Sequence, residues 1–331
     1  MITHVVFDGV ADGPLGVGLE VVGTAARLAA RSAAAVRSQH ELRSRQRIVS
    51  VDGAPVRTGA GRLLEVDGAL RAQGGGVLVL PGLGAATERE IEALLVRADV
   101  VHGAALIARA HAKGALVAAS CSSTFVLGAS GVLDGGEATT TWWLGEAFAR
   151  RFPRVKLCSD RMVIDGSGVM TAGAAFAHAD LMLAIVARTV SPSLAHLAAK
   201  YLVLDERASQ SRYMVMEHMR SADPVVRALE RLVAQNMERQ VSLAEMARAT
   251  ATSPRTLARR VEAALRTTPQ RFAQRLRMAR AVHLLETTSR SVDAVAASVG
   301  YADAAAFRRV FRRETGDTPA RSRAAMTTPR T

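Results

Sequence analysis

The sequence has few cysteines, few lysines and few aromatic residues, and these shortages exclude several classes of protein. Two cysteines among 331 residues cannot form a disulfide framework, which favours a reducing, cytoplasmic compartment. The eight histidines and two cysteines show no spacing typical of metal ligands, so we expect no metal. The start, MITHVVFDGV, lacks a basic segment ahead of an apolar run, so it does not predict a secretory signal.

Long uncharged runs are also scarce. Residues 114–133 form one, and its 20 residues are enough to span a bilayer. Glycines and the polar cluster Ser-Cys-Ser-Ser-Thr interrupt this run, however. It therefore predicts two short buried elements joined by a turn, and no membrane partner.

Positive charge is concentrated in the last third of the chain. From Asp223 to the end there are 20 arginines, no lysine and 10 acidic residues, a net charge of +10 out of +13 for the whole chain. Such a basic segment is typical of a nucleic-acid-binding module.

From the N-terminus to about residue 190, strand-like and helix-like segments alternate. The runs VLVL (77–80) and LVAAS (116–120) are continuously apolar or small, as in strands buried on both faces. Helix-like segments follow them, over 87–113 and 124–133. This alternation predicts an α/β fold of flavodoxin-like type, with a parallel sheet sandwiched by helices. The turn GLGAAT has Thr87 where a dinucleotide fingerprint needs a third glycine, so we expect no cofactor.

Two segments near the C-terminus share one layout, over about 242–265 and 291–315. Each begins with a serine that can cap a helix, Ser242 or Ser291, and continues through a short helix, a turn and an arginine-rich second helix. The pattern predicts two helix-turn-helix units and an all-α C-terminal domain. Between them, 269–287 predicts one helix of about 30 Å, close to the roughly 34 Å pitch of B-DNA. An all-helical interaction domain with solvated arginines is the alternative.

Residues from about 223 to 325 resemble the AraC/XylS family of DNA-binding domains, most specifically over RLRMARAVHLLETTSRSVDAVAASVGYADAAAFRRVFRRETGDTPARSR. The resemblance implies that the second helix of each unit enters the major groove of double-stranded promoter DNA. An alanine can at most touch a thymine methyl group, so we expect base readout to depend on arginines. The positions that the resemblance assigns to base contact are Arg255, Ala258, Arg259, Ala304, Ala305, Arg308 and Arg309.

Cys121 lies in VAASCSSTFVLGASG, between a strand-like run and a helix-like run. A cysteine on such a turn has the geometry of a nucleophile elbow, where the N–H groups of a helix start stabilise a thiolate. Residues from about 4 to 190 resemble the DJ-1/PfpI superfamily, of the class I glutamine amidotransferase-like fold, over VLVLPG, this turn, GASGVLDGGEATTTWW and TAGAAFAHADLMLAIV. The resemblance places Cys121 on the reactive cysteine of that family. The order of the two domains resembles the GlxA family of regulators.

The departures from the family pattern concern the groups that assist a nucleophile. Trp142 stands where members that do chemistry usually carry a histidine, and Pro14 stands at the carboxylate position, with Asp12 two residues earlier. A thiol without a base and an orienting carboxylate is a poor catalyst, so we expect no enzyme. The residues expected to line a ligand pocket are Cys121, Ser122, Ser123 and Trp142. A redox-sensing thiol, a structural residue and a catalytic nucleophile are the alternatives for Cys121.

Three parts are thus predicted: a ligand-sensing and dimerisation domain over 1–190, a helical linker over 191–222, and an AraC-type DNA-binding domain over 223–331. The predicted function is a cytoplasmic, sequence-specific transcriptional regulator that responds to a small-molecule effector and forms a homodimer. The alternative is a thiol-dependent hydrolase, hydratase or deglycase with an appended DNA-binding module.

Overall fold

The chain folds as two units, Met1–Ala208 and Ser209–Thr331. The computed structural model describes residues 1–30, 46–205, 207, 209–210, 213–214, 223–265 and 267–327. The segment 191–222, predicted as a linker, is divided between the units. Its helix packs into the larger unit through Ala195 and Ala198, Ser209 begins the smaller unit, and 215–222 lie outside the described residues.

A six-stranded sheet forms the centre of the larger unit, in the order β2-β1-β5-β6-β10-β9. All neighbouring strands are parallel except β9, which pairs antiparallel with β10. The strands are β1 (Ile2–Val5), β2 (Gln46–Val49), β5 (Val77–Leu80), β6 (Leu116–Ser120), β9 (Val163–Asp165) and β10 (Val169–Ala172). The predicted parallel α/β fold is therefore confirmed.

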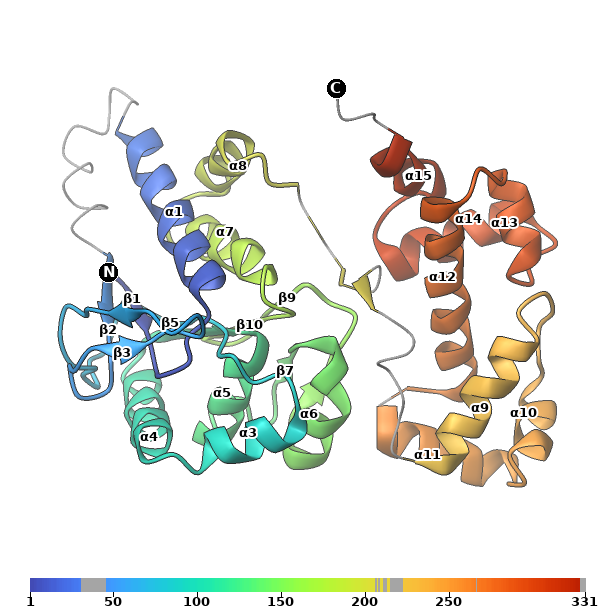
Figure 1. Cartoon of the computed structure of the whole chain (residues 1–331), viewed down its shortest axis with the longest axis horizontal. Coiled ribbons are helices and arrows are strands. Elements are labelled where there is room, and N and C mark those ends of the chain that lie inside the picture. Colours follow the sequence, from blue (N-terminus) through green and yellow to red (C-terminus); the bar gives the residue numbers. More distant parts are fainter. Residues whose placement is uncertain are drawn as a thin grey trace. The chain divides into compact units, whose positions relative to one another are not determined.

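Helices cover both faces of this sheet (Figure 1). Because side chains alternate along a strand, Leu78 and Leu80 point into one core and Val79 into the other. One face packs on α1 (Asp12–Ala29), α7 (Ala177–Thr189) and α8 (Pro192–Tyr201), and the other on α3 (Glu88–Leu95), α4 (Ala98–Ala112) and α5 (Thr124–Ser130). The smaller elements are β3 (Val56–Arg57) paired with β4 (Leu63–Leu64), β7 (Glu137–Ala138) paired with β8 (Lys156–Leu157), and α6 (Gly145–Arg151).

The smaller unit is helical and has two cores that share the central helix α12. Its helices are α9 (Pro224–Gln235), α10 (Leu243–Ala249), α11 (Pro254–Leu265), α12 (Pro269–Thr287), α13 (Val292–Ser298), α14 (Ala304–Thr315) and α15 (Pro319–Thr327). Phe272 and Leu276 of α12 pack in the first core, and Leu285 packs in the second with Phe307 and Phe311. Figure 1 shows α9 to α11 at one end of α12 and α13 to α15 at the other.

The helix starts follow the capping residues in the sequence. The Ser242 side chain accepts a hydrogen bond from the Glu245 N–H in a capping box, and Ser291 accepts one from the Ala294 N–H. Both predicted caps are confirmed. Among the described residues, none of the helices combines the length and the apolar character needed to cross a bilayer.

Candidate ligand site and nucleic-acid interface

Cys121 occupies a strained turn directly after β6. Its φ of 57° lies in the left-handed region, which residues other than glycine rarely adopt. The chain passes from the strand into the short 3-10 helix Cys121–Ser123 and then into α5. The Cys121 N–H donates to the Gly173 carbonyl oxygen at 2.8 Å, which ties the turn to the end of β10. The turn therefore has the nucleophile-elbow geometry predicted from the sequence.

The thiol of Cys121 is buried beside a run of threonines. Its Sγ is hydrogen-bonded to Thr141 Oγ1 at 3.2 Å, and the Thr140 hydroxyl donates to the Cys121 carbonyl oxygen at 2.8 Å. In the described part of the chain, Thr141 is the only side chain hydrogen-bonded to this thiol. Sequence reasoning missed Thr141, although it directly precedes Trp142 in TTTWW.

The two serines after Cys121 have structural hydrogen bonds. Ser122 Oγ donates to the Leu83 carbonyl oxygen at 2.6 Å, and Ser123 Oγ donates to the Pro81 carbonyl oxygen at 2.5 Å. Both side chains are fully buried. Their hydroxyl groups hold the cysteine turn against the segment that follows β5.

Trp142 begins the 3-10 helix Trp142–Leu144 and is half-buried. Its indole lies edge-on to that of Trp143, with ring centroids 5.1 Å apart. Pro14 is buried in the first turn of α1. The Asp12 carboxylate accepts from the Ala60 N–H at 3.1 Å. Trp142, a predicted pocket residue, thus directly follows Thr141, whose hydroxyl is hydrogen-bonded to the Cys121 thiol.

A histidine lies close to the Cys121 turn, but its hydrogen-bond partner is Ser120 and not the cysteine. His178 Nδ1 of α7 is hydrogen-bonded to Ser120 Oγ at 2.9 Å, and the ring is fully buried. Burial, with a smaller contribution from the charge of His4, lowers the pKa of His178 to about 3. No group of three or more His, Cys, Asp or Glu side chains among the described residues is arranged to hold a metal ion.

The arginines predicted to contact bases are exposed on the second helix of each unit. Arg255 and Arg259 project from α11 without a hydrogen bond or an ion pair to any described residue. Arg308 Nη2 of α14 lies 3.1 Å from the Asp293 carboxylate, and Arg309 Nη2 lies 4.0 Å from that of Asp303. The predicted alanines are Ala258 and Ala304, which are half-buried, and Ala305, which is exposed.

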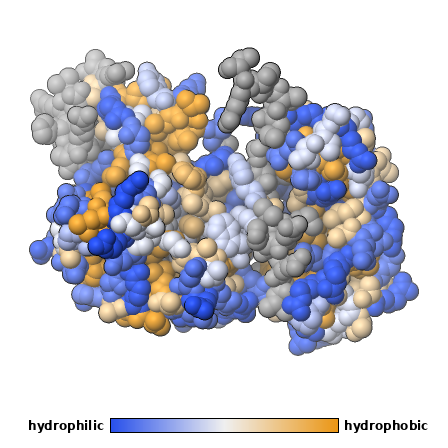
Figure 2. Space-filling model, in the orientation of Figure 1, coloured by the Kyte–Doolittle hydropathy of each residue, from blue (hydrophilic) through white to orange (hydrophobic). Residues whose placement is uncertain are grey.

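The helix between the two units has the predicted length. α12 contains 19 residues, or about 28 Å at 1.5 Å per residue. Most residues on the face of the smaller unit in Figure 2 are hydrophilic. Surface arginines of this kind suit contacts with phosphate and with guanine edges.

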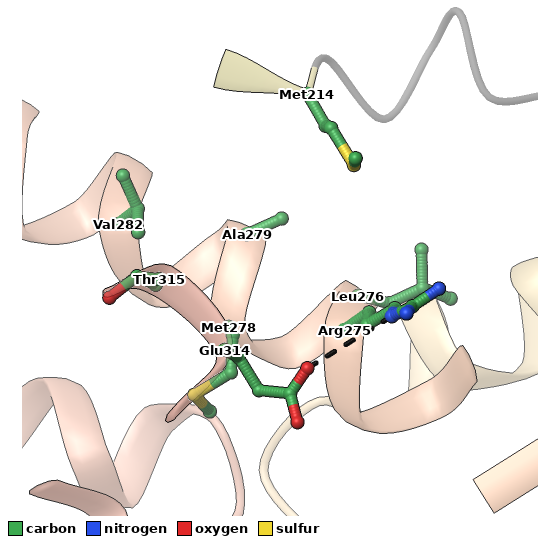
Figure 3. Close-up of a pocket in the computed structure, with 8 residues that line it drawn as sticks. All are labelled: Met214, Arg275, Leu276, Met278, Ala279, Val282, Glu314 and Thr315. Atoms are coloured by element: carbon green, nitrogen blue, oxygen red, sulfur yellow. Dashed lines mark ion pairs between the residues drawn. The ribbon is translucent and has the colours of Figure 1, made fainter. Parts of the chain in front are cut away.

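Two described residues ahead of α9, Ser209 and Met214, contact α12 and the end of α14. Figure 3 shows Met214 pointing into a pocket with Leu276, Met278 and Val282. The Glu314 carboxylate lies 4.0 Å from Arg275 Nε in the same pocket, and the Glu314 carbonyl oxygen accepts from Ser209 Oγ at 3.4 Å. This contact was not predicted, because Ser209 and Met214 fall within the segment that was predicted to be a linker.

Comparison with known families finds one matching family for each of the two units. The DJ-1/PfpI family matches residues 19–188, and a helix-turn-helix domain matches residues 246–325. The first match covers the Cys121 turn. The second covers both arginine-bearing helices, α11 and α14, and leaves out only the start of the first helix-turn-helix unit.

Several similar proteins are transcriptional regulators by name. The chain is 27% identical to the HTH-type transcriptional regulator CdhR of Pseudomonas aeruginosa over 289 residues, which cover 85% of this chain and 82% of that protein. It is 28% identical to the HTH-type transcriptional regulator GlxA of Rhizobium meliloti over 60% of this chain and 62% of that protein. The crystal structure of a THiJ/PfpI family protein from Pseudomonas syringae has a similar fold, with a TM-score of 0.50 and 21% identity over 76% of this chain and 88% of that one.

Proposed function

The chain belongs to the DJ-1/PfpI family and carries an AraC-type helix-turn-helix domain after it, and on this premise we propose that it is a transcriptional regulator controlled by a small molecule. The smaller unit binds promoter DNA through α11 and α14. The larger unit binds the effector beside Cys121. A promoter-binding role is consistent with the cytoplasmic location predicted from the sequence.

The observation that carries the DNA-binding role is the repeat of two arginine-bearing helices at the ends of one helix. Arg255 and Arg259 at one end, and Arg308 and Arg309 at the other, are exposed to solvent. Their separation by the 19-residue helix α12 matches successive major grooves on one face of a duplex.

Two features support a binding role for Cys121 over a catalytic one. The thiol is hydrogen-bonded to the Thr141 hydroxyl, which is not a base at neutral pH. His178, which contacts the residue before Cys121, is hydrogen-bonded to Ser120 and is held neutral by burial. Since no base among the described residues is hydrogen-bonded to the thiol, the elbow positions the thiol for contact with a ligand but does not activate it.

A promoter-binding experiment tests the effector site. The full-length protein is first footprinted on genomic DNA. Its affinity for the bound fragment is then measured with and without the metabolites that the enzymes encoded by neighbouring genes produce. We expect Cys121→Ser and Trp142→Ala to bind the fragment like the wild type but to lose the metabolite response. If both variants keep the response, the effector binds elsewhere. If the wild type consumes a metabolite and Cys121→Ser does not, the enzyme alternative is correct.

We also propose that the regulator is a homodimer. Two copies present four recognition helices, which increases affinity for a site with two repeated halves. Light scattering at micromolar concentration is expected to give twice the 35.0 kDa mass of the chain. A monomer under these conditions contradicts this part of the proposal.

A further inference from the structure

A cleft of about 530 Å³ lies within the smaller unit, between the two helix-turn-helix units. Met246 of the first unit lines it with Gln240 and Val241 just ahead of that unit. The N-terminal half of α12 forms the floor, and Tyr301 and Arg313 contribute from the second unit. The recognition residues named above are not among those that line it. The cleft is therefore a feature that the proposed base contacts do not explain.

Arg277 of α12 is buried in this cleft without a negative partner. The residue is only 4% exposed, and its Nη2 donates to the Arg239 carbonyl oxygen at 2.7 Å. Its Nε has no hydrogen-bond partner, and no carboxylate of the described residues forms an ion pair with it. Burial lowers the pKa of Arg277, which reflects the unfavourable desolvation of its charge.

The other charged groups of the cleft are mainly positive. Arg271 and Arg313 line it together with Arg277, and the single carboxylate is that of Glu314. Glu314 is already engaged, because Arg313 Nε lies 3.2 Å from one of its oxygens and Arg275 Nε lies 4.0 Å from the other. Arg313 Nη2 also donates to Gln274 Oε1 at 2.8 Å. Three arginines thus face a cleft that is lined by one carboxylate, and that carboxylate already contacts two arginines.

We propose that this cleft binds a phosphate group. Guanidinium N–H groups donate to phosphate oxygens in charge-assisted pairs, and a buried cation without a counter-charge gains most from such a partner. Arg277 would supply the buried charge and Arg271 the charge at the rim. The phosphate can belong to the DNA backbone between the two major grooves, which rests on the proposed function, or to a free phosphorylated molecule.

Inorganic phosphate is the probe for the first experiment, which contains no DNA. Binding to the full-length protein is measured by calorimetry at constant ionic strength, with chloride as the reference anion. We expect Arg271→Gln and Arg277→Met to weaken phosphate binding at least about tenfold. Arg280→Gln, an exposed arginine of the same helix outside the cleft, is the matched control and is expected to bind like the wild type.

The second experiment identifies the source of the phosphate. If the cleft holds a backbone phosphate, inorganic phosphate competes with DNA, and Arg271→Gln lowers the slope of log affinity against log salt by about 1. If it holds a free ligand, phosphate binds without displacing DNA and the salt slope is unchanged.

Arg271→Gln keeps the proposal testable should Arg277→Met fail to fold, because Arg277 is buried and Arg271 lies at the rim. The proposal is overturned if Arg271→Gln matches Arg280→Gln in both phosphate binding and salt slope. Phosphate binding is measured without DNA, so a protein that ignores promoter DNA but binds phosphate contradicts the proposed function alone.

Discussion

His178 Nδ1 lies 2.9 Å from Ser120 Oγ. Ser120 directly precedes the Cys121 turn, and both side chains are buried away from water. Burial lowers the pKa of His178 to about 3, so the ring is neutral in the folded protein at neutral pH. In the unfolded chain a histidine titrates near its ordinary pKa of about 6.5. The burial of this ring thus couples the free energy of unfolding to pH.

Because the folded pKa is depressed, the unfolded chain takes up the proton first. Stability is complete above about pH 6.5 and is lost as the pH falls towards 3. At pH 5 the loss from His178 is about 2 kcal/mol. Urea unfolding at pH 7.5 and pH 5 measures it. We expect His178→Gln to reduce this pH dependence and His196→Gln, at an exposed position of α8, to keep it. An unchanged pH dependence in His178→Gln contradicts the coupling.

Arg255 and Arg308 are expected to dominate operator binding. Replacing either with alanine should lower the affinity for the specific fragment by about 1–3 kcal/mol, because each removes an arginine that can pair with a guanine edge. Fluorescence anisotropy with labelled promoter DNA measures the change. Arg231→Ala, at an exposed position of α9 outside both recognition helices, is the control. Wild-type affinity in both variants would refute the assignment of these helices.

Asp293 is expected to weaken DNA binding in the wild type. Its carboxylate lies 3.1 Å from Arg308 Nη2, and the pair is exposed, so it contributes only about 0.2–1 kcal/mol to stability. DNA must replace this carboxylate as the partner of Arg308. Asp293→Asn should therefore raise DNA affinity by up to about fivefold, or roughly 1 kcal/mol. The gain should vanish in the double variant with Arg308→Ala. A gain that persists without Arg308 means that Asp293 acts through general charge repulsion.

Local signals in the sequence predicted the parts of the structure that depend on neighbouring residues. The serine caps at 242 and 291 and the bounds of α12 were predicted correctly, because capping and helical periodicity are encoded within a few positions. The turn at Cys121 was predicted for the same reason.

Contacts between distant elements were not predictable in this way. The Thr141 hydroxyl reaches Cys121 from 20 positions away, and His178 reaches Ser120 from 58 positions away. Packing of the threonine run and of α7 against β6 decides both contacts, and no spacing in the sequence records it. The same holds for the cleft at Arg277, whose walls come from both helix-turn-helix units.

The turns of the two helix-turn-helix units differ at one equivalent position. Ala251 and Gly300 each stand two residues after the first helix, and both are left-handed, with φ of 50° and 83°. An L-residue pays about 1–2 kcal/mol for this conformation, whereas glycine adopts it freely. A Cβ at Gly300 would also lie 3.0 Å from the Met237 carbonyl oxygen and 3.3 Å from the Arg239 nitrogen.

Opposite substitutions in the two turns should therefore have opposite effects. Ala251→Gly relieves the backbone strain and should raise the free energy of unfolding by up to about 1 kcal/mol. Gly300→Ala adds both strain and crowding, and should lower it by about 1–3 kcal/mol. Urea unfolding of the full-length protein measures both, and DNA affinity should fall only in Gly300→Ala, because the second unit packs on the Met237–Arg239 segment through this turn. If Ala251→Gly lowers the free energy of unfolding as much as Gly300→Ala does, the strain assigned to Ala251 is contradicted.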